Sequence, residues 1–427
     1  MKLAKIIKTP RTYWILAFII SMLAGFFAGE PVLLFAVIYG GILWIILLRL
    51  YRKQIEKIQL GRRSPAGVYE EGELETTYYL ANESNWPLFA PVARDRLPFS
   101  AEFVSNARFA GLIGPGQLLS CSYTARCRAN FGRYTLGPTA LTISDPLGLV
   151  EVKKIFEKYQ PVTLYPRWEK LNWLPIFGGR RRIVEHTKSS SKTAQGQDFY
   201  GLREYQRGDP VKNIHWRSVA RHNELIVKQF EYPAASSIHI FIDLHKKRRK
   251  GLGAKSTLRT TAHLTASVAA YSIKNGHRVG LHGKGKQNIY LPPRAGNIQL
   301  TAIVDTLVDI NQEGETTLEH LLAESLPNIS EGSSIVLVIP TTRISPKKYL
   351  HSLSILEGRR TSVLVLLIDD RNMLKIDGSK ADYSRDWTVE ELKNSFIAHG
   401  AWCRIIDPEP GLAQQFPGRT MWTRHAV

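Results

Sequence analysis

The sequence is poor in cysteine. Three cysteines occur among 427 residues, and Cys121 and Cys127 belong to a segment whose alternation is typical of a strand. An extended chain would separate their Cα atoms by about 20 Å, at about 3.3 Å per residue, so they cannot form a local disulfide. Cys403 is distant in sequence. The pattern excludes a disulfide framework and a cysteine-based metal site, and it is typical of a reducing compartment.

Acidic residues are few relative to basic ones. The chain holds 57 Lys and Arg against 37 Asp and Glu, for a formal net charge of +20. This excess predicts anionic partners, which are lipid headgroups, nucleic acid or an acidic protein surface. Nucleic acid is the least favoured, because the basic residues are scattered and form no known nucleic-acid-binding module.

The sequence signatures of common enzymes are missing. No G-x-x-x-x-G-K-[ST] phosphate loop occurs, and the glycines and lysines of residues 280–287 lie between two expected strands, as in a hairpin turn. Ser218 has no exposed glycine elbow, and no cysteine lies near it. The sequence therefore predicts no catalytic residue and no cofactor.

Long apolar runs without charge occur in the first fifty residues. They are residues 13–29 and 31–48, with Glu30 in a Gly-Glu-Pro turn between them. Each run is close to the roughly 20 residues that cross a hydrocarbon core, so we expect a transmembrane hairpin. Lys and Arg flank its outer ends but not its turn, which places both termini in the cytoplasm and the chain in the inner membrane. The alternative is a cleaved signal peptide followed by one anchor.

The remaining chain is too long for a single core. Residues 56–165 show short alternating runs broken by turn residues, which favours a β-sandwich. From residue 236 strands and helices alternate, and the apolar strands are typical of a doubly wound α/β sheet. We expect strands at 236–244, 277–283, 288–293, 333–340, 361–369 and 401–407, and helices at 257–274, 297–311, 317–326, 346–357 and 388–398.

The segment between these parts, residues 166–235, is polar and crowded with charges. Residues 178–197 predict an exposed basic loop. Asp209 and Pro210 predict the start of a short helix over about 210–220, since Asp caps a helix and Pro suits its first turn. A strand is expected over 223–231.

Two motifs resemble a known family. They are "FGRYTLGPTALTISDPLGL" (131–149) and "GQDFYGLREYQRGDPVKNIHWRSVARHNELIVKQFE" (196–231). They are similar to motifs of the bacterial "domain of unknown function 58" proteins, with Phe131 and Leu147 as small departures. The resemblance implies a multidomain protein: a transmembrane helical hairpin (1–55), a β-sandwich-like domain (56–165), a family-signature junction (166–235) and a von Willebrand factor A-like α/β domain (236–427).

The resemblance also raises the question of a metal site. A von Willebrand A domain often binds Mg²⁺ through a D-x-S-x-S motif, a Thr and a further Asp at the edge of its sheet. Asp243 and Thr316 match this pattern, but His245 and Lys247 stand at the Ser positions, and Pro340 with Thr341 at the second Asp. We therefore expect a degenerate site without a metal.

Five consecutive cations follow Asp243 almost directly. One interpretation of this run is a solvated loop. The other is a converted site that presents cations to an anion, either an acidic partner or lipid headgroups. The residues are Lys246, Lys247, Arg248, Arg249 and Lys250.

The junction is interpreted as a polar brace, with a buried Arg–Glu ion pair, aromatic packing surfaces and a turn with a helix cap. Its residues are Asp198, Arg203, Glu204, Tyr205, Gly208, Asp209 and Trp216. A binding surface with Arg207, Lys212, His215 and Arg217 is an alternative.

The sequence thus favours a membrane-anchored scaffold or adaptor that faces the cytoplasm and is not an enzyme. The family resemblance implies a MoxR-type AAA+ ATPase and a transglutaminase-like membrane protein as partners, in envelope-protein assembly or maturation. The alternative function is a hydrolase acting through the acidic and histidine cluster of residues 198–216. Arg203 and Arg207 weigh against it, because they would neutralise the neighbouring acids.

Overall fold

The computed structural model divides the chain into two compact units, Met1–Tyr165 and Pro166–Val427. This boundary coincides with the expected end of the β domain. The structure describes residues 19–23, 27, 31–99, 106–176, 198–206, 211, 214–222, 224–231, 237–253, 255–359, 361–373, 387–408 and 411–416.

A long helix, α3 (Pro31–Glu56), opens the well-described part of the first unit. Among the described residues, its segment Phe35–Glu56 is the one helix long and apolar enough to cross a membrane. The helix continues past the expected end at residue 48 and buries Ile55 in the core of the β domain. The other expected span, residues 13–29, lies mostly outside the described residues, so the hairpin stays a prediction.

The β domain is built from short strands, as the alternating pattern predicted. In β3 the side chains alternate between buried and outward positions along the strand. The strands are β1 (Ile58–Arg63), β2 (Gly67–Tyr69), β3 (Glu73–Asn82), β4 (Leu88–Asp95), β5 (Ala107–Arg108), β6 (Leu112–Ile113), β7 (Leu118–Arg126), β8 (Gly132–Leu136), β9 (Thr139–Ser144), β10 (Glu151–Phe156) and β11 (Gln160–Tyr165).

Two sheets of this domain share one apolar core. Their strand orders are β1-β3-β7 and β10-β9-β4-β5, with β6 paired to β4, and a third sheet has the order β2-β11-β8. Leu60 and Leu80 from the first sheet meet Leu141 and Ile143 from the second. Inward-facing residues of two sheets that meet in this way form a sandwich.

One ion pair is buried at the side of this core. The Arg62 guanidinium lies 2.7 Å from Asp95, whose carboxylate also accepts hydrogen bonds from Tyr78 (2.6 Å) and Thr139 (3.1 Å). Because Asp95 has three donors, its charge is compensated within the domain.

The signature junction folds as a small hairpin. β12 (Asp198–Glu204) pairs antiparallel with β13 (Ile226–Glu231), and α4 (Trp216–His222) lies between them in sequence. The predicted strand is confirmed. The predicted helix start is wrong in position, because α4 begins at Trp216 instead of near Pro210. His215 precedes it, and Asp209 and Pro210 lie outside the described residues.

The α/β domain follows the expected alternation closely. Its main elements are β14 (Ser237–Ile242), α5 (Thr257–Lys274), β17 (Arg278–Lys284), β18 (Asn288–Arg294), α6 (Asn297–Val308), α7 (Leu318–Ser325), β19 (Ser334–Pro340), α8 (Leu350–Gly358), β20 (Ser362–Ile368), α9 (Val389–Ala398), β21 (Trp402–Ile406) and α10 (Leu412–Gln415). Short pieces connect them: η2 (Lys246–Arg248), β15 (Gly251–Leu252), β16 (Lys255–Ser256), η3 (Leu326–Asn328) and η4 (Pro346–Tyr349).

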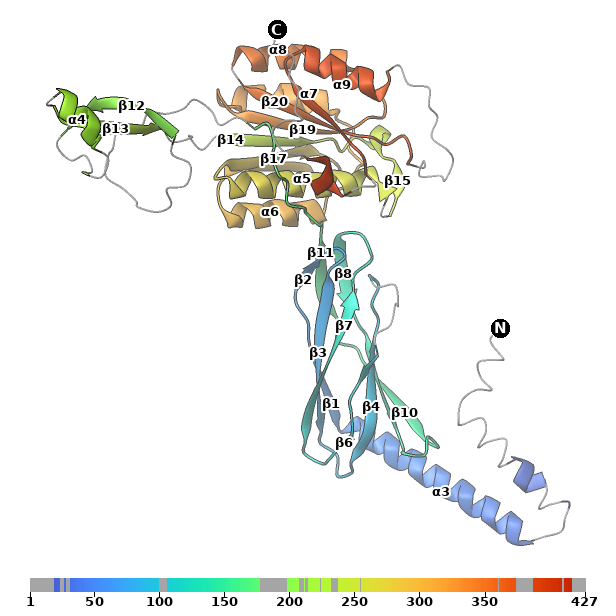
Figure 1. Ribbon diagram of the computed structural model, residues 1–427. Coiled ribbons are helices and arrows are strands. Elements are labelled where there is room, and N and C mark those ends of the chain that lie inside the picture. The colour runs from blue at the N-terminus through green and yellow to red at the C-terminus, as the bar shows by residue number, and fades with distance from the viewer. Residues whose placement is uncertain are drawn as a thin grey trace. The chain divides into compact units, whose positions relative to one another are not determined.

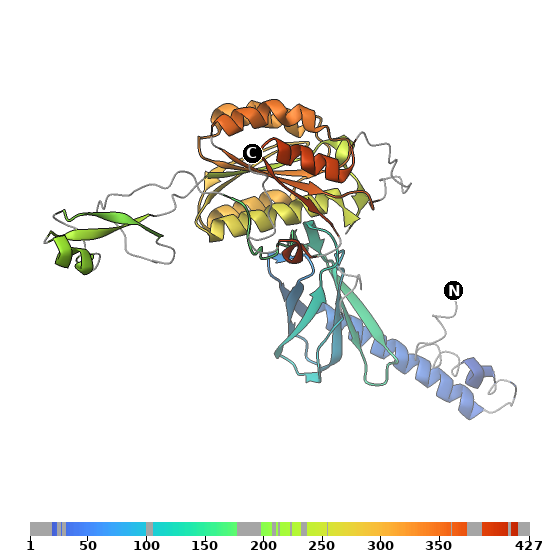
Figure 2. The ribbon, with the colours of Figure 1, turned by 45° about the horizontal axis from the view of Figure 1, so that its top comes forward.

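The six-stranded sheet has the order β18-β17-β14-β19-β20-β21, with β18 antiparallel to its neighbour and the others parallel. Helices α5 and α6 lie on one face, and α7, α8 and α9 on the other (Figure 1, Figure 2). Because both faces are covered, β19 is buried along its whole length. The core on the second face joins Phe241 and Leu337 of the sheet to Leu322, Leu353 and Phe396 of the helices.

Candidate functional site

The chain leaves β14 toward β17 on one side and returns as β19 on the other. The carboxyl ends of β14 and β19 therefore form a topological switch point, where open α/β sheets generally bind ligands. Three strands deliver polar residues to this edge: Asp243 follows β14, Thr341 and Thr342 follow β19, and Asp370 comes two residues after β20.

Asp243 is 1% exposed and has a cation of the same chain beside it. The guanidinium of Arg248, itself 4% exposed, donates directly to its carboxylate. Arg248 also lies 3.3 Å from the Glu319 carboxylate and 3.4 Å from the Tyr349 hydroxyl, which donates to Glu319 at 3.2 Å. The guanidinium thus stands between two carboxylates and a phenol.

The pKa values in this group agree with a fixed charge on Arg248. Burial alone would lower the pKa of Arg248, but Tyr349 and Glu319 raise it above its ordinary value. Burial raises the pKa of Tyr349, so its hydroxyl stays a donor. A buried guanidinium held by two carboxylates remains charged and cannot act as an acid or a base.

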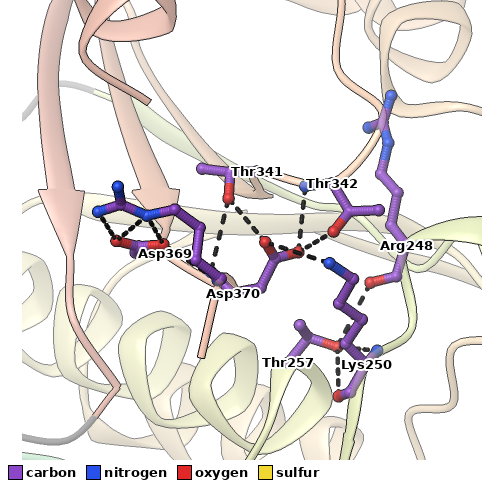
Figure 3. A network of polar contacts seen from close by, with 8 residues as sticks. Arg248, Lys250, Thr257, Thr341, Thr342, Asp369 and Asp370 are labelled. Atoms are coloured by element: carbon purple, nitrogen blue, oxygen red, sulfur yellow. Dashed lines mark hydrogen bonds and ion pairs between the residues drawn. The ribbon is translucent and has the colours of Figure 1, made fainter. Parts of the chain in front are cut away.

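A second buried carboxylate, that of Asp370, is held by hydroxyls and a lysine (Figure 3). It accepts hydrogen bonds from the Thr341 hydroxyl (2.8 Å), the Thr342 backbone N–H (3.1 Å) and the Thr342 hydroxyl. The Lys250 ammonium lies 3.8 Å from it and is 7% exposed. Thr257 secures the Lys250 backbone by accepting from its N–H (3.0 Å) and donating to its carbonyl (3.2 Å).

The remaining cations of the run form an exposed rim, which we define as Lys246, Lys247 and Arg249. Lys246 lies 2.7 Å from Glu315, and Arg249 lies 3.9 Å from Glu313. Exposed pairs of this kind contribute only about 0–1 kcal/mol each. The rim is therefore accessible to a partner, whereas Arg248 and Lys250 are not.

Residues 201–379 match the model of a family described as "Protein of unknown function DUF58". The match assigns this part of the chain to the DUF58 family. It is also 23% identical over 338 residues to "Uncharacterized protein YeaD" of Bacillus subtilis (strain 168), covering 77% of this chain and 79% of that protein. These matches confirm the family that the two sequence motifs indicated.

Two of the solved structures that match this chain resemble it only weakly. A Pseudomonas fluorescens alkylpurine DNA glycosylase, AlkC, matches with 10% identity over 25% of this chain and 30% of its own, at a TM-score of 0.18. The CARDB domain of a Pyrococcus furiosus protein matches with 11% identity over 25% of this chain and 92% of its own, at a TM-score of 0.19. TM-scores this low carry no argument about fold or function.

The two positions that match the metal-site pattern, Asp243 and Thr316, have different surroundings in the structure. Asp243 belongs to the group of polar contacts around Arg248. The half-buried Thr316 precedes α7. The hydrogen bonds to the backbone after β14 come instead from Gln312, to the Asp243 carbonyl, and from the Gly314 N–H, to the Leu244 carbonyl. Asp370 also lies at this edge of the sheet, but it was not among the residues predicted from the sequence. The acidic pair directly after the apolar strand "VLVLLI" could have indicated it. Within the described ranges no group of three or more His, Cys, Asp or Glu is arranged to hold a metal ion.

The expectation for the basic run needs a correction. Arg248 and Lys250 do not present their charges outward, because each is buried against a carboxylate of the same sheet edge. Binding of an external anion by the whole run is therefore excluded by burial, and binding by the rim alone stays a prediction.

The expectation for the junction is met only in part. Glu204 is exposed, so the prediction that it forms a buried ion pair is wrong. Trp216, which was expected to supply a packing surface, is 62% exposed. Tyr205 is half-buried. The side chains of Asp198 and Arg203 and all of Gly208 and Asp209 lie outside the described residues, so the brace itself stays a prediction.

One polar contact in the junction bears on the hydrolase alternative. The His215 Nδ1 and Ser218 Oγ atoms lie 2.6 Å apart, and the Ser218 backbone N–H donates to the His215 carbonyl. Both residues stand at the beginning of α4, where side chains commonly satisfy helix N–H and neighbouring groups. A contact between residues three apart at a helix start has this local explanation, so it does not indicate a catalytic pair.

Proposed function

We propose that this chain is a membrane-anchored adaptor whose α/β domain binds a partner protein without a divalent cation. The observation that carries the proposal is the pairing of the buried Asp243 with the buried Arg248 at the switch point. A metal ion could reach this carboxylate only by displacing a guanidinium that two carboxylates hold. The edge of the sheet is thus available for contact with a partner but unsuited to metal-dependent chemistry.

The finer fold assignment under this proposal is a von Willebrand factor A-like domain. The strand order, the antiparallel edge strand β18 and the helices on both faces support it. In this assignment Arg248 supplies internally the positive charge that a bound cation supplies in relatives with an intact site. The partner then recognises side chains around the edge and not a coordinated metal.

Two surfaces are suited to that partner. The rim offers three cations for an acidic surface. The β12–α4–β13 hairpin exposes large apolar side chains, namely Leu202, Val211, Trp216 and Leu225. Aromatic and apolar anchors beside basic residues are typical of protein interfaces. The partner class implied by the family resemblance is a MoxR-type AAA+ ATPase, acting in envelope-protein assembly or maturation.

The anchor under this proposal is the hairpin of the expected span 13–29 and α3, which keeps both ends of the chain in the cytoplasm. The apolar part of α3 has the length of a membrane span, and Arg49, Arg52 and Lys53 follow it directly. Basic residues beside a span favour the cytoplasmic side. The α/β domain then works close to the anionic leaflet.

A photo-crosslinking amino acid at Lys247 of the full chain, used in native membranes, tests the proposal. We expect one major protein, identified by mass spectrometry as an AAA+ ATPase, and equal capture with Mg²⁺ or with a chelator. With the crosslinking residue kept at position 247, reversal of the two remaining rim charges in Lys246→Glu/Arg249→Glu should reduce capture, whereas Lys274→Glu on α5 should not. Loss of capture in chelator, or no response to rim reversal, would contradict a metal-independent adaptor.

A further inference from the structure

The turn between β9 and β10 lies directly against the apolar helix α3. The indole N–H of Trp44 donates to the Leu149 carbonyl at 3.1 Å. Further along, the Lys154 ammonium lies 3.0 Å from the Glu56 carbonyl and 3.2 Å from the Ile55 carbonyl. The β9–β10 hairpin therefore contacts the helix at two levels (Figure 1).

The two levels show how the hairpin is oriented. From Trp44 to Ile55 the helix rises by about 16 Å, at about 1.5 Å per residue. From Leu149 to Lys154 a strand covers about 17 Å, at about 3.3 Å per residue. The two lengths agree, so β10 runs alongside α3 with the turn, residues 145–150, foremost toward the apolar end.

The position of Trp44 sets the depth of this turn. The helix stays free of charge from Pro31 to Leu48, and Arg49 is its first cation. Trp44 precedes Arg49 by five residues, which is about 7 Å along the axis. Only about 20 Å of helix precedes Trp44, less than the roughly 30 Å of a hydrocarbon core. A span that begins at Pro31 therefore still lies inside the membrane boundary at Trp44.

The hydrogen bonds of the turn suit it to the membrane boundary. The Asp145 carboxylate accepts from the backbone N–H groups of Val150 (2.5 Å) and Leu147 (3.0 Å), and the Asp145 carbonyl accepts from Gly148 (3.0 Å). The backbone N–H groups of Leu147, Gly148 and Val150 are thus satisfied within the turn, which lowers the cost of moving them out of water. At its tip Leu147 is 71% exposed.

We infer that the turn of residues 145–150 inserts Leu147 into the headgroup boundary of the bilayer, as a second membrane contact that orients the β domain on its anchor. The inference rests on the membrane anchoring proposed above. The occupant of this surface is lipid, because the turn is bonded to the segment of α3 that lies within the apolar span. Interfacial elements commonly enter this boundary by about 5–10 Å, which matches the depth set by Trp44.

Cysteine accessibility in the full chain, reconstituted in vesicles of phosphatidylethanolamine and phosphatidylglycerol, tests the inference. In a Cys121→Ser background, Leu147→Cys is compared with Ile155→Cys, its matched control on the same hairpin at the level of the helix end. Leu147 is 71% exposed and Ile155 56%, so the protein itself does not shield position 147. We expect a polar maleimide to react several-fold more slowly at position 147 in vesicles and at equal rates at both positions in denaturant.

If the two positions react at equal rates in vesicles and the chain stays in the membrane after alkaline washing, the insertion of the turn is contradicted. The membrane anchoring is then unaffected. Release of the chain by alkaline washing would overturn the anchoring and the inserted turn together. A doxyl-lipid quenching measurement on bimane attached at position 147 gives an independent readout. Strong quenching supports insertion, and quenching no greater than at position 155 contradicts it.

Discussion

At the scale of single residues, charge compensation distinguishes neighbours in the basic run. Arg248 and Lys250 are buried beside Asp243 and Asp370, whereas Arg249 between them is exposed. Three residues of the same charge type thus lie in two different environments. Two of them are paired with carboxylates inside the domain, and one is exposed at its surface.

The variant Arg248→Met tests this difference. It leaves Asp243 and Glu319 without their guanidinium, and breaking a buried pair in this way costs about 3–5 kcal/mol. Arg249→Met, the matched control, should change the free energy of unfolding by about 0–1 kcal/mol, because its pair is exposed. Urea unfolding of both variants measures the difference. Similar losses in the free energy of unfolding would show that the burial of Arg248 does not determine its contribution to stability.

A buried histidine pair makes the α/β domain sensitive to acid. His239 on β14 and His282 on β17 lie 3.0 Å apart, and Phe241 and Tyr290 pack on His282. Burial lowers the pKa of His239 to about 4, and burial together with His239 lowers that of His282 to about 4, from 6.5. Between these values the unfolded chain binds more protons than the folded one.

The free energy of unfolding should therefore fall as the pH drops from about 6.5 to about 4, and level off below that. The effect amounts to several kcal/mol for the pair, at about 1.4 kcal/mol per pKa unit. The double variant His239→Val/His282→Leu should have a shallower pH dependence of its urea midpoint, while His320→Gln, which is exposed, should keep the wild-type dependence. An unchanged slope in the double variant would contradict this assignment.

At the scale of elements, the amino-acid pattern predicted most of the strands and helices. Helix α5 spans the expected residues, β19 begins one residue later than expected, and β20 is one residue shorter at each end. Continuous apolar runs and side-chain caps such as Ser256 carry this information locally. The start of α4 was misplaced because the prediction relied on the Asp-Pro pair at 209–210, whereas the helix begins at Trp216.

The end of α3 depends on a side chain from a distant strand. Lys154 donates to three carbonyls there, those of Ile55, Glu56 and Ile58. The last carbonyls of a helix need such partners.

Lys154→Met should therefore destabilise the β domain by about 1–2 kcal/mol, since hydrogen bonds from a charged group are among the stronger ones. Lys153→Met, on the opposite face of β10, should have little effect. Thermal unfolding of the full chain in detergent compares the two variants. A larger loss for Lys153→Met would contradict the capping role.

At the scale of the whole molecule, each unit has apolar clusters of its own among the described residues. The cluster under α7, α8 and α9 is drawn from residues 241–403, and the two clusters of the β domain from residues 55–164. A unit with its own core is expected to fold by itself.

Residues 166–427 expressed alone should therefore be soluble and unfold in one cooperative transition, at the same urea midpoint as this unit has in the full chain. Circular dichroism and tryptophan fluorescence should report the same transition. An aggregated or non-cooperative product would show that the α/β domain needs the first unit to fold.

The sequence by itself determined the division of the chain and the element types, because apolar periodicity and turn residues act over short stretches. The family was indicated by the resemblance of two motifs, at residues 131–149 and 196–231. Only the tertiary structure decided which charges are internal. Asp243, Arg248 and Glu319 come together from the residue after β14, from η2 and from α7. Asp370 and Lys250 come from segments 120 residues apart. Burial of a charge depends on partners that the fold brings from elsewhere, so five adjacent cations look alike in sequence and differ in the folded domain.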